Sequence, residues 1–105
     1  MVDQVKVDIA KCSRVIEELK GEIMKNLWLF QQGTLRASES EMINSLGGIV
    51  GSCYVLTRRF GFEFSDLDRM LYNKMEEWQA GDKLNLESEW GDLSLLLEYL
   101  LPNEK

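Results

Sequence analysis

The chain has 105 residues, of which 45% are hydrophobic, a length that predicts one domain over residues 1–105 with a small core. Its net charge of −6 argues against nucleic acid as a partner, because phosphate binding needs clustered lysine and arginine, whereas the same charge suits divalent cations. The absence of histidine removes the commonest general base, the Ser-His and Cys-His nucleophile pairs and most zinc sites. Any catalysis is therefore expected to be carboxylate and metal chemistry.

The sequence also bears on where the protein works. Its first six residues, Met-Val-Asp-Gln-Val-Lys, lack the apolar run of a secretory signal, and no apolar run is long enough to span a membrane. Cys12 and Cys53 each fall on the apolar stripe of a predicted helix, which predicts buried, reduced thiols. We therefore expect a cytoplasmic protein that has no membrane partner.

The first predicted helix ends at Gly33 and carries an apolar stripe with steps of three and four residues: Val5, Ile9, Cys12, Ile16, Leu19, Ile23, Leu27 and Phe30. Glu18 and Glu22 flank this stripe one helical turn apart, so they share a face. The pattern is typical of a solvated face with lysines nearby, which is the favoured interpretation. The alternative is that both carboxylates hold a metal ion.

The second predicted helix begins with a capping box between Ser38 and Glu41 and ends at Gly61. Its apolar stripe consists of Met42, Leu46, Ile49, Cys53, Leu56 and Phe60. Arg58 lies in its last turn, where a cation suits the helix dipole; phosphate binding is the weaker alternative. Three glycines interrupt its interior: Gly47, Gly48 and Gly51. Each costs roughly 1 kcal/mol relative to alanine, so we expect a compensating role. Close contact with another helix is favoured over close approach of a ligand.

The third predicted helix starts with a second capping box, formed by Ser65 and Asp68, and ends at Gly81. Lys74 lies on this helix within an otherwise apolar stripe. A lysine in such a place usually extends its amine to water, and contact with an anion is the alternative.

The fourth predicted helix starts near Asn85 and is ended by Pro102. Its apolar stripe consists of Leu86, Trp90, Leu93, Leu97 and Leu100. On a continuous helix, Glu89 and Asp92 would share one face, because they lie three residues apart. This is how an all-helical protein builds a magnesium site, and also how an ordinary helix fills its first turn with acids.

Four helices with short connections predict an all-α protein, a four-helix bundle in which neighbouring helices are antiparallel. In such a ring, the first and fourth helices are often adjacent. Their acids could then converge, and four close carboxylates are costly without a cation, since each raises the pKa of the others. Magnesium would remove that cost and could also hold a phosphate substrate.

Five segments carry a resemblance through their order along the chain: Val15-Ile-Glu-Glu-Leu-Lys20, Cys53-Tyr-Val-Leu-Thr-Arg-Arg-Phe-Gly61, Phe64-Ser-Asp-Leu-Asp68, Lys74-Met75, and Glu89-Trp-Gly-Asp-Leu-Ser-Leu-Leu-Leu-Glu-Tyr-Leu100. In this order they resemble the MazG-like branch of the all-α nucleoside triphosphate pyrophosphohydrolases. The resemblance implies a homodimer or larger homo-oligomer. It also implies that Glu-Glu-x-x-Glu on one helix and Glu-x-x-Asp on the next hold magnesium, which activates water to release pyrophosphate and a monophosphate.

The sequence departs from both of these motifs. In the first helix, residues 17–22 read Glu-Glu-Leu-Lys-Gly-Glu, so the third acid is displaced by one residue. Counted back from the Arg-Arg-Phe-Gly end of the second helix, the expected Glu and Asp are replaced by Ser45 and Gly48. Glu41 and Asn44, one turn earlier, are a poor substitute.

Two hypotheses fit these departures. In one, the metal site has moved, and magnesium is held by Glu18, Glu22, Glu89 and Asp92. Lys74 or Arg58 would then contact the phosphates of a nucleoside triphosphate. In the other, the catalytic site has decayed, and the fold persists as a non-catalytic helical module that binds a protein partner or itself. Decay is favoured, because relocation requires the first and fourth helices to be adjacent and in matching register.

Overall fold

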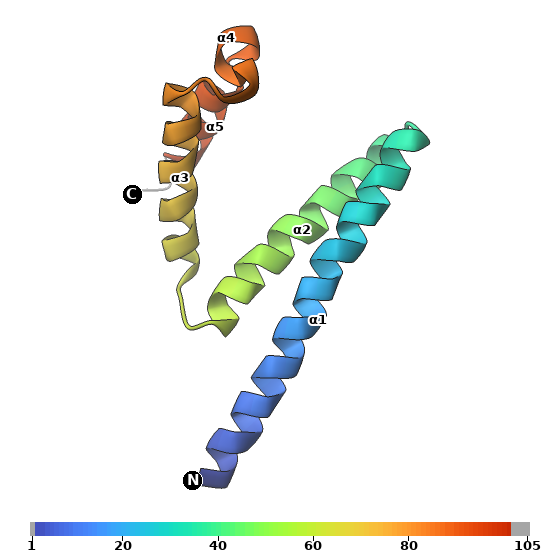
Figure 1. Cartoon of the computed structure of the whole chain (residues 1–105), viewed down its shortest axis with the longest axis vertical. Coiled ribbons are helices and arrows are strands. Elements are labelled where there is room, and N and C mark those ends of the chain that lie inside the picture. Colours follow the sequence, from blue (N-terminus) through green and yellow to red (C-terminus); the bar gives the residue numbers. More distant parts are fainter. Residues whose placement is uncertain (1, 102–105) are drawn as a thin grey trace. The chain divides into compact units, whose positions relative to one another are not determined.

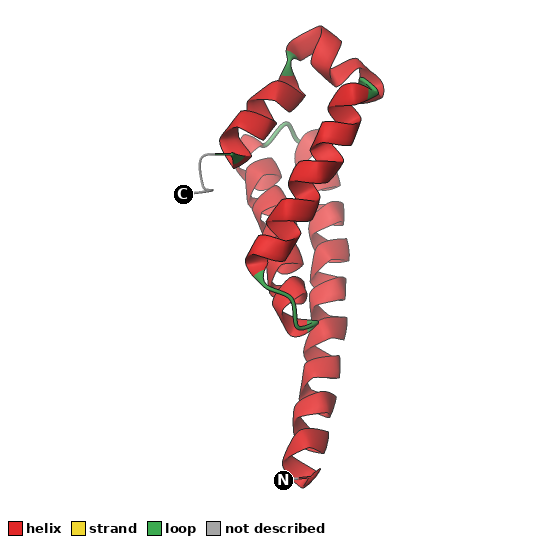
Figure 2. Ribbon diagram, turned by 90° about the vertical axis from the view of Figure 1, so that its left-hand side faces the viewer, coloured by secondary structure: helices red, strands yellow, loops and turns green. Residues whose placement is uncertain are grey.

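The computed structural model describes residues 2–101, with side chains described from residue 10 onward, and every regular element in this part of the chain is a helix (Figure 2). The elements are α1 (Val2–Leu35), α2 (Glu39–Arg59), α3 (Phe64–Ala80), the 3₁₀ helix η1 (Lys83–Asn85), α4 (Leu86–Trp90) and α5 (Asp92–Leu100). The all-α prediction is confirmed. None of the described helices is both long and apolar enough to cross a bilayer. Pro102, the predicted end of the last helix, lies outside the described residues.

The chain forms two compact units, Met1–Phe62 and Glu63–Lys105. The first unit contains α1 and α2, and the second contains α3, η1, α4 and α5 (Figure 1). Each unit has its own packing. The organisation of residues 1–105 as one domain remains a prediction.

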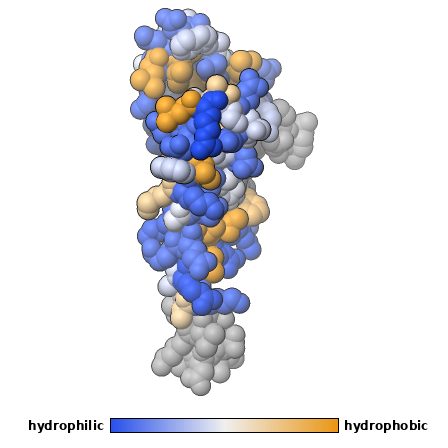
Figure 3. All heavy atoms as spheres, turned by 90° about the vertical axis from the view of Figure 1, so that its right-hand side faces the viewer, coloured by the Kyte–Doolittle hydropathy of each residue, from blue (hydrophilic) through white to orange (hydrophobic). Residues whose placement is uncertain are grey.

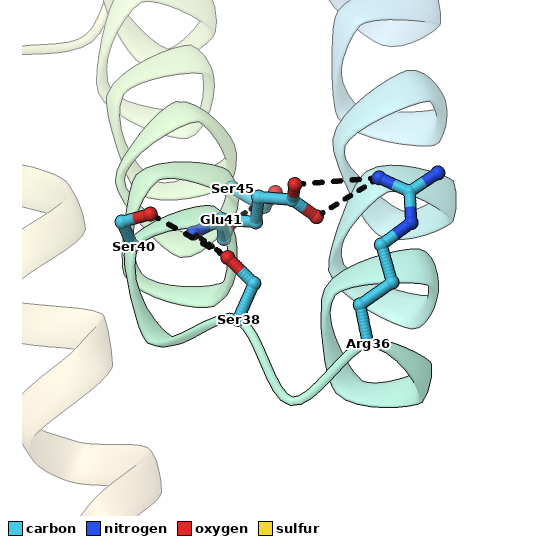
Figure 4. Close-up of polar contacts among 5 residues, drawn as sticks. All are labelled: Arg36, Ser38, Ser40, Glu41 and Ser45. Atoms are coloured by element: carbon cyan, nitrogen blue, oxygen red, sulfur yellow. Dashed lines mark hydrogen bonds and ion pairs between the residues drawn. The ribbon is translucent and has the colours of Figure 1, made fainter.

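The first unit is an antiparallel helical hairpin, in which α1 (blue in Figure 1) and α2 (green) lie side by side. α1 continues two residues past Gly33, the predicted end. At the turn, the Ser38 N–H donates to the Gly33 carbonyl (2.9 Å), and the Ser38 hydroxyl accepts the Glu41 N–H (3.4 Å), which confirms the predicted cap. The Glu41 carboxylate binds the Arg36 guanidinium (3.3 Å) instead of completing a capping box (Figure 4).

We call the contact between these two helices the α1–α2 seam. It is lined by half-buried or buried residues of both helices: Cys12, Ile16, Leu19, Ile23, Asn26, Phe30 and Gly33 of α1 and Met42, Ser45, Gly48, Ile49, Ser52 and Leu56 of α2. Its spacing of three and four residues is that of a coiled coil. The predicted stripes placed Leu27 and Leu46 in this contact, and that placement is wrong, because both are exposed. The seam instead passes through buried Asn26, Ser45 and Ser52.

Both cysteines belong to the first unit, and both are free thiols. The sequence predicts that both are buried; in the structure both are only half-buried. The Cys12 thiol donates to the backbone carbonyl of Arg59 (3.4 Å), which ties the last turn of α2 to α1.

The second unit packs α3 against α5 around a core of Met75, Leu93 and Leu97. The N-cap of α3 is Glu63, two residues before the predicted cap Ser65. Its N–H donates to the Asp66 carboxylate (2.8 Å). This hydrogen bond, followed by the one from Arg69, lowers the pKa of Asp66.

The fourth predicted helix is divided in two. Gly91 has φ 70° and ψ 21°, a left-handed conformation that ends α4 after five residues and starts α5 on a new axis. Asp82, Leu84 and Asn85, just before α4, also have positive φ. We call residues 86–100 with this break at Gly91 the α4–α5 corner. The prediction of one continuous helix over this stretch is wrong.

Candidate functional site

The two positions at which the resemblance places second-helix carboxylates lie in the α1–α2 seam. Ser45 is 1% exposed, and its hydroxyl donates to the backbone carbonyl of Glu41 (2.8 Å) (Figure 4). At Gly48, a Cβ atom would lie only 2.6–2.8 Å from the side-chain amide of Asn26. Real Cβ atoms essentially never approach other atoms so closely, so a side chain at Gly48 would force the Asn26 side chain, or one of the two helices, to shift. As it stands, the seam does not fit a magnesium ion held between these helices.

Asn26 fills the space opposite Gly48. It is 5% exposed, its Nδ2 donates to the backbone carbonyl of Glu22 (2.8 Å), and the same atom lies 3.4 Å from Oε2 of that residue. The sequence analysis missed Asn26, because Leu27 also continues the apolar stripe with acceptable spacing. A strict alternation of three and four residues from Leu19 would have pointed to Asn26.

Glu17, Glu18 and Glu22 of α1 lie outside the seam at exposed positions. Glu17 pairs with Lys20 (3.0 Å) and Glu22 pairs with Lys25 (3.6 Å), both as i,i+3 neighbours. Glu18 is exposed and forms no side-chain hydrogen bond or ion pair with the described residues of its own unit. Exposed pairs of this kind contribute little to stability.

Glu89 and Asp92 lie on opposite sides of Gly91, at the end of α4 and the start of α5. They are exposed, and the prediction that they share one helix face is wrong, because the left-handed glycine separates the two helices. Within either unit, the described residues contain no group of three or more Cys, Asp or Glu side chains that could hold a metal ion.

The proposed ligand set combines both units, so the convergence of Glu18 and Glu22 with Glu89 and Asp92 remains a prediction. The same holds for the two phosphate-binding candidates, Arg58 in the last turn of α2 and Lys74 on α3. Both of these cations are exposed.

A separate polar network holds the α4–α5 corner. The Glu87 carboxylate accepts the Ser94 backbone N–H (2.9 Å) and the Ser94 hydroxyl, and Gln79 of α3 donates to that hydroxyl (3.0 Å). The hydrogen bond from the Ser94 hydroxyl and, with a smaller effect, the one from the Ser94 N–H lower the pKa of Glu87. Asp82 caps α4 by accepting the N–H groups of Glu87 and Ser88 (both 3.1 Å). Sequence reasoning missed this network, because Glu87 and Ser94 are spaced as two residues on one face of an unbroken helix.

The profile of the MazG-like family matches residues 9–93, which is most of the chain. No curated protein and no solved structure matches the sequence.

Proposed function

Because the chain belongs to the MazG-like family, which relates it to the nucleoside triphosphate pyrophosphohydrolases, we propose that it is a MazG-like protein without metal-dependent hydrolase activity. Its helices would serve as an interaction module. The observation that carries this proposal is the close packing of Asn26 against Gly48 in the α1–α2 seam. The space that a second-helix carboxylate would need is filled by a neutral amide, and the neighbouring Ser45 uses its hydroxyl on its own helix.

The partner that we propose is a second copy of the chain. Large hydrophobic side chains are exposed on both helices of the first unit: Met24, Leu27, Trp28, Ile43, Leu46, Val50 and Val55. Figure 3 likewise shows hydrophobic side chains at the surface among hydrophilic ones. Exposed apolar surface of this kind is typical of protein association, and the family resemblance implies a homo-oligomer.

A second candidate function is magnesium-dependent hydrolysis of a nucleoside triphosphate at a relocated site. The observation that favours it is that Glu18, Glu89 and Asp92 are exposed and form no side-chain hydrogen bond or ion pair with described residues of their own units. Together with Glu22 they would hold the metal. Lys74 or Arg58 would contact the phosphates.

Magnesium-linked stability distinguishes the two functions, since an ion that binds only the native state must raise the melting temperature. For the non-catalytic module, we expect 5 mM magnesium chloride to raise the melting temperature of the wild type no more than sodium chloride of equal ionic strength. This concentration is about a hundred times a dissociation constant of about 50 μM, enough to stabilise a protein that binds the ion.

The matched control is Asp92→Asn, which removes one proposed ligand from an exposed position. A melting temperature that rises specifically with magnesium in the wild type, and fails to rise in this variant, would support the relocated site and contradict the proposal.

A further inference from the structure

The sequence of the α4–α5 corner has the hydrophobic spacing of one continuous helix, yet the structure is bent there. Leu86, Trp90, Leu93, Leu97 and Leu100 are spaced as one face of a continuous helix. In the structure, Leu93 and Leu97 are buried (3% and 8% exposed), whereas Trp90 is 66% exposed. Because of the break at Gly91, the Trp90 side chain does not lie on the buried face that contains Leu93 and Leu97.

The first half of the corner, α4, is short, although Leu86 packs against the core of the second unit. A helix of five residues, such as α4, is not stable by its own hydrogen bonds. Leu84, just before it, has φ of 53°, a left-handed conformation that is costly for a leucine, whereas Asn85 (φ 59°) tolerates it more readily. Among side-chain hydrogen bonds in the described part of the chain, the break is bridged by the Glu87 carboxylate, which caps the start of α5 by accepting the N–H and the hydroxyl of Ser94.

This contact and an unbroken helix exclude one another. In a continuous α-helix, residues seven apart are separated along the axis by about 10 Å, so a Glu87 carboxylate could not reach the Ser94 N–H. In that helix, the Ser94 N–H would instead be bonded to a backbone carbonyl four residues earlier. The Asp82 cap on the N–H groups of Glu87 and Ser88 is compatible with both arrangements, because it lies before the break.

We propose that residues 86–100 form a two-state conformational device. One state is the bent corner with the Glu87–Ser94 contact, and the other is a single helix in which that contact is broken. The straight state places Trp90 on the same face as Leu93 and Leu97. It also places Glu89 and Asp92 on one face, so the device controls how these two acids lie relative to one another. This inference does not depend on either proposed function.

Nuclear magnetic resonance of the full chain tests the device through the backbone conformation of residue 91 and the Cα chemical shifts of Trp90 and Asp92. A Cβ at Gly91 meets nothing within 4 Å, so Gly91→Ala changes only the conformational preference there. Since the left-handed conformation disfavours alanine, we expect a shift of about five- to thirtyfold toward the continuous helix. Glu87→Ala, which removes the cap of α5, is expected to shift the balance in the same direction.

Glu89→Ala is the matched control, because it removes an exposed acid from the same short helix without touching Ser94. We expect it to keep the bent corner. Should Gly91→Ala fail to fold, Glu87→Ala decides the question by the same shifts. A folded Glu87→Ala protein in which Gly91 keeps its positive φ, with unchanged shifts at Trp90 and Asp92, would overturn the proposal.

Discussion

Gly48→Ala is expected to lower the free energy of unfolding by about 1–3 kcal/mol, the usual cost of forcing extra atoms into a closely packed contact. The new Cβ would lie 2.6–2.8 Å from the Asn26 amide, and Asn26 cannot simply turn away, because its Nδ2 is bonded to the Glu22 carbonyl. Urea denaturation followed by circular dichroism measures the change.

The same helix provides matched controls for this variant. Gly47 and Gly51 are exposed, and a Cβ at either meets nothing within 4 Å. Replacing a mid-helix glycine by alanine then stabilises by roughly 0.5–1 kcal/mol. We therefore expect the free energy of unfolding to fall in Gly48→Ala and to rise in Gly47→Ala and Gly51→Ala. A stabilised Gly48→Ala protein would contradict the close packing of the α1–α2 seam.

Asn26→Asp is expected to have the largest effect on stability, a loss of about 3–5 kcal/mol, the cost of an uncompensated buried charge. The substitution keeps the shape of the side chain but replaces the Nδ2 donor with an oxygen. That oxygen would face the Glu22 carbonyl at the present 2.8 Å and lie near the carboxylate of the same residue. Thermal and urea unfolding at neutral pH measure the loss.

Gln31→Glu is the control for this substitution, because it makes the same amide-to-carboxylate change at an exposed position of α1. We expect it to change the stability by less than about 0.5 kcal/mol. The loss in Asn26→Asp should also shrink at acidic pH, where a protonated carboxyl can again donate to the Glu22 carbonyl. Equal stability of the two variants would show that Asn26 is not buried against the second helix.

The helical class could be predicted from the sequence because hydrophobic spacing and helix caps agree over most of the chain. Which residues form the buried face of each helix could not be predicted. Leu27 and Asn26 both continue the row of α1 within the tolerance of a helical period, and hydrophobicity favoured leucine. At this place the seam is closely packed, with Gly48 directly against the Asn26 amide, and its neighbour Leu27 is left exposed.

The site was less predictable than the fold, because it depends on contacts that no local pattern encodes. Glu89 and Asp92 have helical spacing, yet a left-handed Gly91 separates them. The residue that stabilises this break is Glu87, through a contact with Ser94 on the other side of the corner. By contrast, the loss of carboxylates at Ser45 and Gly48 follows directly from the sequence once the family motif is aligned to it.

Pyrophosphate release tests the central claim most directly. It is measured with folded protein on a panel of ribo- and deoxynucleoside triphosphates, with magnesium or manganese, beside Asp92→Asn. Because Ser45 and Gly48 occupy the positions of the second-helix carboxylates, we predict no metal-dependent release from any substrate in either protein. Metal-dependent release by the wild type that is lost in Asp92→Asn would contradict this account and would instead establish a relocated site at Glu18, Glu22, Glu89 and Asp92.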